Sequence, residues 1–497
     1  MFDSQNRIKL FLLFVLFPIL FAACNNNSEK KSENSGGNGN GDDVSLINGT
    51  DADLQITFDS LPEVDFEGAD FVIGNIEGWV WIDVTLDVEA EETGEVLNEA
   101  IYNRNRAVEE KYNINIQIVP IEGESMGSRA RTLMQAGDCN LDIMQTPTRV
   151  AAPITVDNLV ADANKLNSID FAHPWWDDFA HASTSIIGKN FFLYGDFTIA
   201  DKEYATAIFF NKEMQAIYAL PNYYDIVRAG DWTIDIMLES MRAATSDLDG
   251  DGKWTKDDQY GLVTNIHSQA MLFYGAGETI VRKDNNDMPY WAVTDESYLN
   301  AFFKMAEFMN TDNTTAEAFK LGSHQDDMFA EGKALFDSSL LAAMRAPQGA
   351  QRGMEYDFGI LPPPKLSTQQ ERYYSFYDGS TPCIVILNHE QERVNRSAVI
   401  LEALNAKSSE DVKRRYMELA LPAKYFRDEE SFEMLEIILQ NRIFDMSAIY
   451  CWGNFESGLR DLLGNNKIDQ VSSFIEKNLD RSVAVMEKDL EQLLVLE

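Results

Sequence analysis

The sequence predicts an α/β protein whose last part is mainly helical, and three observations support this. The chain has 497 residues, of which 45% are hydrophobic and 11% aromatic, enough for two or three packed domains. Between residues 94 and 146, strand-like apolar runs alternate with amphipathic helix-like runs, a pattern typical of a parallel sheet. From Val394 onwards the pattern is almost wholly helical.

The N-terminus has the pattern of a secretory lipoprotein. Arg7 and Lys9 precede an apolar run at 10–21 that is too short for a comfortable membrane span. Ala-Ala-Cys then matches a lipobox, which predicts a signal peptide over 1–23 and lipidation of Cys24. The alternative is an ordinary signal peptide with a chance cysteine. A lipid on Cys24 would anchor the protein at the outer face of the cell membrane.

Residues 24–50 are predicted to form a flexible tether. They are polar and rich in Gly, Asn and Ser, so they cannot bury enough apolar surface to fold. Folded structure is expected from residue 51. The formal net charge of −40 would repel phosphate backbones, which excludes nucleic acid as a partner class.

The next segments predict a β–α–β–α–β order. A strand-rich stretch at 69–86 is followed by a helix at 94–113, in which Leu97, Ile101 and Val108 recur at helical spacing. The remaining elements of this unit are a strand at 113–120, a helix at 128–137 and a strand at 140–146.

The same alternation continues along the chain. The predicted elements are a strand at 189–197, a strand running into a helix at 206–220, helices at 232–245 and 298–311, and a strand running into a helix at 333–344.

Residues 247–258 have the spacing of a twelve-residue calcium loop. Such a loop needs oxygen ligands at positions 1, 3, 5, 7, 9 and 12 and a glycine at position 6. Gly252 takes position 6 and Thr255 position 9, while Asp258 stands where the longer Glu is usual. No second copy of the loop exists, so we expect a structural calcium site rather than a paired sensor. The predicted ligands are Asp247, Asp249, Asp251, Lys253 through its carbonyl, and Asp258. The alternative is an ordinary acidic turn.

Three cysteines remain after Cys24, namely Cys139, Cys383 and Cys451. They are far apart and show no metal-binding spacing, so we expect three buried thiols rather than a disulfide framework.

The order and spacing of several segments resemble extracellular solute-binding protein family 1, the maltodextrin-binding-like lipoproteins of ABC importers. The resemblance covers nearly everything after residue 60. The segments that carry it are HPWWDD at 173–178, YGDFTIADKEYATAIFFNKEM at 194–214, the acidic loop with its DQYGL end, FGILPPPK at 358–365 and ESFEMLEIILQNRIFDMSAIYCWG at 430–453, after ETGEVLNEAIYNRNRAVEEKYNI at 92–114.

The resemblance implies a two-lobed periplasmic-binding-protein-like fold with a hinge and a central ligand cleft. It implies crossings near 200, 376 and 408. One lobe would then comprise 51–200 with 376–408, and the other 201–375 with 409–497. A monomer that delivers a carbohydrate to ABC permease subunits is the expected function. The calcium loop would lie in the second lobe, away from the cleft.

The candidate ligand-binding residues are aromatic side chains, which suit the apolar faces of a sugar, and polar side chains, which suit its hydroxyl groups. Gln145, Thr146 and Arg149 follow a predicted strand at its carboxyl end, where open α/β sheets bind ligands, although a solvated loop is the alternative. Trp176 and Trp452 could equally be core side chains. Asp201 and Asn211 are expected to support the hinge. The other candidates are Trp175, Tyr274, Tyr377 and Asp378.

Enzyme classes find little support in the sequence. There are five His, and no HExxH, GxSxG, GxGxxG or P-loop pattern is present. Carboxylate pairs could serve a glycosidase, but among 81 acidic residues such pairs arise by chance. The alternatives that stay open are a non-sugar ligand such as a peptide, a surface adhesin and a glycan-degrading enzyme.

Overall fold

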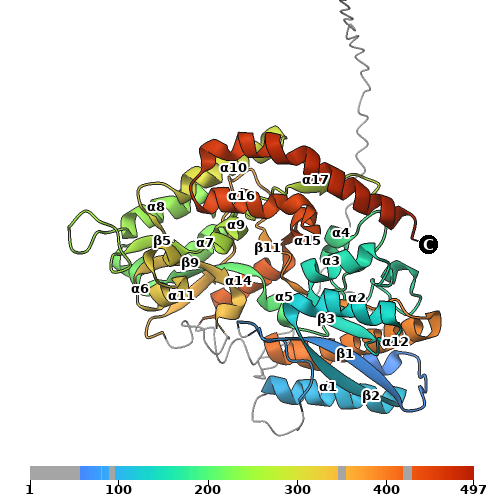
Figure 1. Cartoon of the computed structure of the whole chain (residues 1–497). Coiled ribbons are helices and arrows are strands. Elements are labelled where there is room, and N and C mark those ends of the chain that lie inside the picture. The colour runs from blue at the N-terminus through green and yellow to red at the C-terminus, as the bar shows by residue number, and fades with distance from the viewer. Residues whose placement is uncertain (1–55, 80, 89–95, 345–353, 418–427, 497) are drawn as a thin grey trace, which may run out of the picture. The chain divides into compact units, whose positions relative to one another are not determined.

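The computed structural model describes residues 56–79, 81–88, 96–344, 354–417 and 428–496 (Figure 1). The predicted signal peptide, Cys24 and the tether at 24–50 lie outside the described residues. Within the described part, no helix combines the length and the apolar character that crossing a membrane requires.

The first sheet joins three strands near the N-terminus to one that comes much later in the chain. Its order is β12-β3-β1-β2; β2 and β3 run parallel to β1, and β12 runs antiparallel to β3. The predicted β–α–β–α–β order is therefore confirmed. The strands are β1 (Ala69–Glu77), β2 (Ile114–Glu122), β3 (Ile143–Pro147) and β12 (Pro382–Ile386).

Helices cover both faces of this sheet because its strands alternate apolar side chains between two cores. Phe71 and Ile73 of β1 share one core with Val108 and Leu401, while Val72 points into the other core with Met126. The helices are α1 (Val96–Tyr112), α2 (Met126–Ala136), α3 (Thr148–Val156) and α12 (Gln391–Ser408), and α1 contacts α12.

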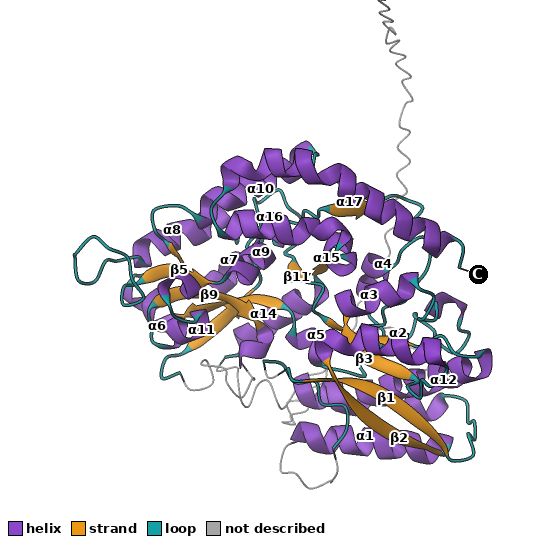
Figure 2. Cartoon of the chain, in the orientation of Figure 1, coloured by secondary structure: helices purple, strands orange, loops and turns teal. Residues whose placement is uncertain are grey.

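The second sheet has the order β10-β4-β9-β5-β8. Its strands β8 and β9 run parallel to β5, whereas β4 is antiparallel to both β9 and β10. Figure 2 shows that helices flank the strands of both sheets. The strands are β4 (Thr206–Asn211), β5 (Tyr260–Thr264), β8 (Thr315–Glu317), β9 (Ala334–Leu340) and β10 (Phe358–Leu361).

The chain passes between the two sheets more than once. It goes from the first to the second through α5 (Ala200–Glu203) and returns through β11 (Ser375–Tyr377) before β12. It leaves again after α12 through the π-helical turn η7 (Ser409–Lys413), and β13 (Arg442–Phe444) then pairs in parallel with β11. The described residues therefore form two sheet-containing lobes joined by several segments.

The C-terminal part is helical, as predicted, apart from the three-residue β13. It consists of α14 (Glu429–Gln440), α15 (Met446–Tyr450), η9 (Trp452–Asn454), α16 (Phe455–Gly464), η10 (Ile468–Gln470) and α17 (Val471–Leu494).

The described residues contain further helices, turns and strands. They are η1 (Phe58–Ser60), η2 (Gly123–Ser125), η3 (Ala163–Lys165), α4 (Asp178–Thr184), α6 (Lys212–Ile217), α7 (Tyr223–Arg228), α8 (Ile234–Ala244), α9 (Ile266–Tyr274), β6 (Val281–Lys283), β7 (Pro289–Trp291), α10 (Glu296–Met309), η4 (Ala318–Leu321), α11 (Gln325–Ala330) and η5 (Leu341–Met344).

Three sequence predictions of local structure were wrong. Residues 189–197 form no strand; only isolated bridges occur, such as Leu193 with Ile384, although the segment is buried. The predicted helix after β9 is the 3-10 turn η5. Cys139 and Cys383 are buried, but Cys451, which follows α15 as its C-cap, is exposed.

A buried carboxylate ties α12 to the first sheet. Asp142, which is 1% exposed, accepts hydrogen bonds from Val72 N at 2.7 Å and from Arg393 Nε at 2.8 Å. Arg396 Nη2 donates to the same carboxylate at 3.1 Å. Removing the Asp142 carboxylate would leave the buried Val72 N–H without its acceptor and would take the paired negative charge from Arg393 and Arg396.

We therefore expect Asp142→Ala to lower the free energy of unfolding by about 3 kcal/mol, the usual cost of breaking a buried pair from one side. Chemical denaturation monitored by circular dichroism would measure it. Asp138→Ala, an exposed aspartate in the same loop, is the matched control and should cost less than about 0.5 kcal/mol. Equal losses in the two variants would contradict the assigned role of Asp142.

Candidate functional site

A cavity of about 750 Å³ lies between the two sheet-containing lobes. The first lobe and the crossing segments contribute Trp81, Tyr204, Asp378 and Ser380. The second lobe contributes Asn265, His267, Ser268, Met271, Phe319, His324, Gln325, Asp326, Asp327, Ser339, Leu340, Ala342 and Ala343. The volume of the cavity is within the range found for cavities that bind small molecules.

The carboxyl ends of the strands explain why these residues meet. Trp81 follows β1, Asn265 and His267 follow β5, and Phe319 follows β8. Since β5, β8 and β9 are parallel, their carboxyl ends reach the same edge of the second sheet. Ligands of open α/β sheets bind at such edges.

Two large aromatic side chains in this cavity are unusually exposed. Trp81 is 45% exposed and Phe319 is 52% exposed, whereas most large apolar side chains of the described residues are buried. The two rings come from different lobes and both line the cavity. Exposed rings that line a cavity provide flat apolar surfaces for a ligand.

Trp81 is backed by other aromatic rings. Its ring centroid lies 4.9 Å from that of Trp79, which in turn lies 6.4 Å from that of Tyr204. Gly123 allows the approach of Trp79, because a Cβ at Gly123 would lie 2.8 Å from Trp79 Nε1. Trp79 therefore packs against Trp81, which lines the cavity.

The polar groups of the second lobe are held by hydrogen bonds. Asn265 Oδ1 caps α9 by accepting from His267 N at 2.8 Å and Ser268 N at 3.0 Å. Gln325 accepts from Asn265 and donates to Ser268 Oγ at 3.1 Å and Ser338 O at 2.9 Å. These amides are therefore oriented before any ligand binds.

Asp378 is the sequence-predicted residue that lines this cavity. Its carboxylate accepts from Ser380 N at 2.7 Å, and burial raises the pKa of the carboxyl group. Arg149 lies next to this site, where it donates to Ser380 Oγ at 3.2 Å and forms two hydrogen bonds, of 2.8 and 2.5 Å, with Glu124. Arg149 is thus paired, and it supports Ser380.

Gln145 and Thr146 are fully buried in β3 and do not line the cavity. Gln145 Nε2 donates to Asn75 Oδ1 at 2.8 Å and to Val84 O at 3.1 Å. Val84 lies in the segment that carries Trp81. Gln145 therefore supports a cavity residue from behind.

The two adjacent tryptophans, Trp175 and Trp176, lie outside this cavity. Both indoles donate to the carboxylate of Glu402 in α12, at 3.1 and 2.8 Å. They are 2% and 7% exposed and border a smaller cavity of about 340 Å³. The structure favours the packing role for this pair.

Tyr274, Tyr377 and Trp452 are also buried. Tyr274 stacks on Phe376 with ring centroids 3.7 Å apart, and Trp452 Nε1 donates to Asp489 at 3.0 Å. Arg442 lies 5.0 Å above the ring of Tyr377. Each ring is occupied by protein, which favours the core alternative for Trp452 and leaves Tyr274 and Tyr377 without an open face.

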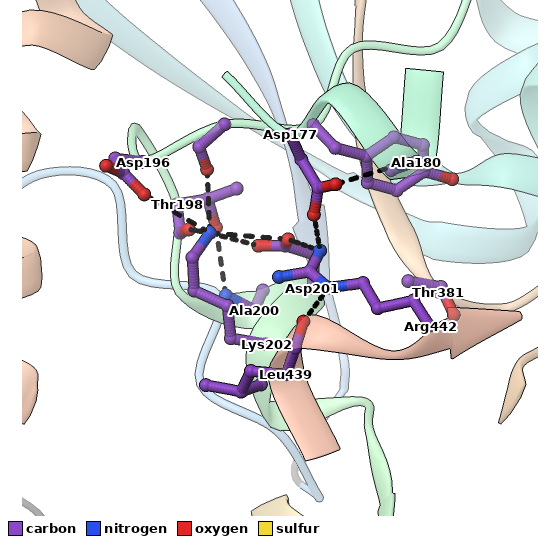
Figure 3. Close-up of polar contacts among 12 residues, drawn as sticks. Asp177, Ala180, Asp196, Thr198, Ala200, Asp201, Lys202, Thr381, Leu439 and Arg442 are labelled. Carbon is purple, nitrogen blue, oxygen red and sulfur yellow. Dashed lines mark hydrogen bonds and ion pairs between the residues drawn. The ribbon is translucent and has the colours of Figure 1, made fainter. Parts of the chain in front are cut away.

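Buried ion pairs connect the crossing segments (Figure 3). Arg442 at the start of β13 contacts Asp177 at 2.6 Å and Asp201 of α5 at 3.1 Å. Lys202 pairs with Asp201 at 3.2 Å and donates to Gly195 O at 2.8 Å. Burial by itself would lower the pKa of Arg442, but the charges of Asp177, Tyr377 and Asp201 raise it. The crossings are therefore joined by charges that are all paired.

His181 lies beside this cluster in α4 and is 3% exposed. Its Nε2 accepts a hydrogen bond from Tyr194 N at 3.1 Å, which requires the neutral ring with the proton on Nδ1. Burial lowers the pKa of His181 to about 4.

The acidic loop brings together three of its five predicted calcium ligands. Carboxylate oxygens of Asp247, Asp249 and Asp258 lie within 4.8 Å of one another. Gly252, with φ 75°, allows the sharp turn, and its N–H donates to Asp247 at 2.8 Å. Asp251 is not in this group; its carboxylate accepts from Lys253 N at 2.7 Å. The three converging oxygens fit a hard cation such as Ca²⁺.

The sequence did not single out Trp81, Phe319, His267 or His324, which line the cavity. Trp81 follows β1 and His267 follows β5, and ligands of open α/β sheets bind at the carboxyl ends of strands. This position after a strand is the sequence signal that could have identified both residues.

The structure is similar to solved sugar-binding ABC substrate-binding proteins. It matches a cyclo/maltodextrin-binding protein complexed with maltotetraose at 12% identity, over 86% of this chain and 98% of that one, with a TM-score of 0.56. It matches the ABC substrate-binding protein Lmo0181 from Listeria monocytogenes, in complex with cycloalternan, at 10% identity over 86% and 97%, with a TM-score of 0.50.

A third similar structure is UgpB from Mycobacterium tuberculosis in complex with glycerophosphocholine, at 12% identity over 85% of this chain and 99% of that one, with a TM-score of 0.53. No protein-family model matches the sequence, and no curated protein matches it either. At these identities the likeness establishes the two-lobed periplasmic-binding-protein fold. The first two neighbours are named as binding proteins rather than enzymes.

From the burial of His181 we predict how the unfolding free energy depends on pH. Its folded-state pKa, about 4, lies below the ordinary value of 6.5, so the unfolded chain binds this proton first. Stability is therefore lost as the pH falls through 6.5 towards 4. Between pH 7 and 5, the wild type should lose about 2 kcal/mol more unfolding free energy than His181→Gln.

Chemical denaturation at the two pH values would measure this difference. If His181→Gln kept the wild-type dependence on pH, the neutral buried ring would not be a source of acid sensitivity.

Proposed function

We propose that this protein captures a carbohydrate, most simply an oligosaccharide, in the cavity between its lobes. The observation that carries the proposal is the pair of exposed rings, Trp81 and Phe319, which line one cavity from opposite lobes. A sugar offers apolar C–H faces to such rings and hydroxyl groups to the fixed amides and carboxylates around them. The fold neighbours that bind maltotetraose and cycloalternan support the same class of ligand.

A ligand that contacts both lobes would couple its binding to the relative arrangement of the lobes. A ligand that touches Trp81 on one lobe and Phe319 on the other stabilises whichever arrangement brings the two closest. It shifts the population only by its difference in affinity for the two arrangements. We propose that the closed arrangement is delivered to ABC permease subunits. No covalent chemistry is needed for this role.

The proposed location is the outer face of the cell membrane, through a lipid on Cys24. The support is the lipobox pattern, followed by a polar tether that would let the folded part reach a permease in the same membrane.

A polar ligand that is not a sugar is the second candidate. The specific observation in its favour is that UgpB, which has a similar fold, was solved with glycerophosphocholine. Three carboxylates line the cavity here, Asp326, Asp327 and Asp378, and they could accept hydrogen bonds from many polar solutes.

Calcium binding by the acidic loop is proposed as a structural feature. Asp247, Asp249 and Asp258 would supply carboxylate oxygens, and the charge of the ion would offset their mutual repulsion. The loop joins α8 to β5, so an ion there would brace the second lobe.

The first prediction concerns ligand capture by the soluble form, residues 45–497. Maltotetraose, cellotetraose, xylotetraose, raffinose and chitotetraose are compared with glycerophosphocholine and tetra-alanine in thermal unfolding at fixed calcium. A ligand that binds only the native state raises the melting temperature, and at 100 times its Kd it adds about 2.7 kcal/mol. We expect at least one saccharide to do so.

Variants locate the site. Trp81→Ala and Phe319→Ala should each weaken the binding of that saccharide by about fivefold or more, since a stacked ring contributes about 1 kcal/mol or more. Phe303→Ala, which removes a ring that is 42% exposed outside the cavity, is the matched control and should bind normally. A shift with glycerophosphocholine or tetra-alanine alone would establish the second candidate. A flat response to all seven compounds would refute solute capture.

The calcium proposal is tested in the same assay. Calcium should raise the melting temperature of the wild type by mass action, and Asp247→Asn with Asp249→Asn should abolish the rise. Asp257→Asn, an exposed neighbour outside the group, should retain it. Loss of the rise in both variants, or no rise in the wild type, would favour an ordinary acidic turn.

A further inference from the structure

Arg104 in α1 is a buried cation whose role the proposed function does not explain. It is 1% exposed, and it forms no ion pair among the described residues. Burial lowers the pKa of its guanidinium to about 9. A charge removed from water in this way must be compensated by hydrogen bonds, so its partners show what it holds.

The guanidinium bonds to three separate segments. Nη2 donates to Leu86 O at 2.6 Å, and Nη1 donates to Phe197 O at 2.9 Å and to Ser408 Oγ at 3.4 Å. The guanidinium also lies 4.8 Å above the ring of Phe197. Arginine suits this task because its donors point in several fixed directions.

The first of these segments carries Trp81 to the cavity. In residues 81–88, Ile82 and Leu86 are buried, and Leu86 O also accepts from Asn105 Nδ2 at 3.0 Å. Val84 O accepts from Asn75 Nδ2 at 2.9 Å and from Gln145 Nε2 at 3.1 Å. Side-chain donors thus anchor the segment through its carbonyl groups, since it belongs to no strand.

The other two segments are crossings between the lobes. Phe197 leads into α5, and its N–H donates to Asn405 Oδ1 at 2.9 Å. Ser408 ends α12 just before the chain leaves for the second lobe through η7. The crossing helix α5 also contacts the Trp81 segment directly, because Asp83 N donates to Glu203 Oε2 at 3.3 Å.

We propose that Arg104 is a positioning residue that couples the crossing segments to the place of Trp81 in the cavity. It touches no ligand. Any movement of the crossings at Phe197 or Ser408 acts on the carbonyl of Leu86 through one rigid guanidinium. The value of this coupling for ligand capture rests on the proposed function, but the placement of Trp81 by Arg104 does not.

The test uses ¹⁹F NMR of protein labelled with 5-fluorotryptophan and needs no ligand. The chain has eight Trp, and Trp81→Phe assigns the resonance of Trp81. We expect Arg104→Met, which keeps volume and removes all donors, to shift or broaden the Trp81 resonance while the buried Trp232 and Trp452 keep theirs. Arg129→Met, at an exposed side chain in α2, is the matched control and should leave the Trp81 resonance unchanged.

Arg104→Lys gives a second reading should Arg104→Met fail to fold, because Lys retains a charge but cannot span three segments. An unmoved Trp81 resonance in a folded variant overturns the proposal. So does a shift of all the tryptophan resonances together, which would indicate a general role in stability.

A double-mutant cycle tests the functional consequence with whichever of the five saccharides binds the wild type. Arg104→Met should weaken its affinity about tenfold in the wild-type background and less than about twofold in the Trp81→Ala background. Additive losses would overturn coupling through Trp81. Absence of binding by the wild type would refute carbohydrate capture alone, since the NMR result stands without a ligand.

Discussion

The buried charges between the lobes impose the constraint on which the rest of the structure depends. Arg442 lies far along the chain from Asp177 and Asp201, and none of the three charges can be left unpaired without a large desolvation cost. Their geometry therefore specifies how β13, α5 and the start of α4 meet. Lys202 and Lys413 extend the network through Asp196, at 3.9 and 2.9 Å. A buried cluster of this kind adds little net stability, because the cost of desolvating the charges offsets much of their attraction.

The cavity is a consequence of this arrangement. The carboxyl ends of β1, β5 and β8 open towards it, so the residues that follow them become its lining. Trp81 and Phe319 remain exposed there although the surrounding chain buries nearly all of its large rings. Exposed apolar surface that lines a groove marks ligand-binding sites in many proteins, which is why the two rings define the candidate site.

Buried polar side chains that do not line the cavity have a different role from those that do. Gln145, Arg104 and Glu402 each have several partners on other segments and contact backbone carbonyls or indoles rather than open space. Their chemistry resembles that of ligand-binding residues, since amides and guanidinium groups suit sugars as well as backbone. This explains why residue type alone favoured Gln145 and the Trp175–Trp176 pair as ligand contacts, while the fold assigns them to support.

The sequence by itself determined the α/β class, the parallel order of β1, β2 and β3, the helical C-terminal part and the convergence of Asp247, Asp249 and Asp258. These depend on local periodicity and on close spacing, which the chain carries without tertiary information. Tertiary structure decided which aromatic rings stay open and which are covered. The sequence alone does not distinguish Trp452 from Trp81. In the structure Trp452 packs against Tyr450 and bonds to Asp489, whereas Trp81 follows β1 and lines the cavity. Exposure depends on partners that lie far away along the chain, so no local pattern could have predicted it.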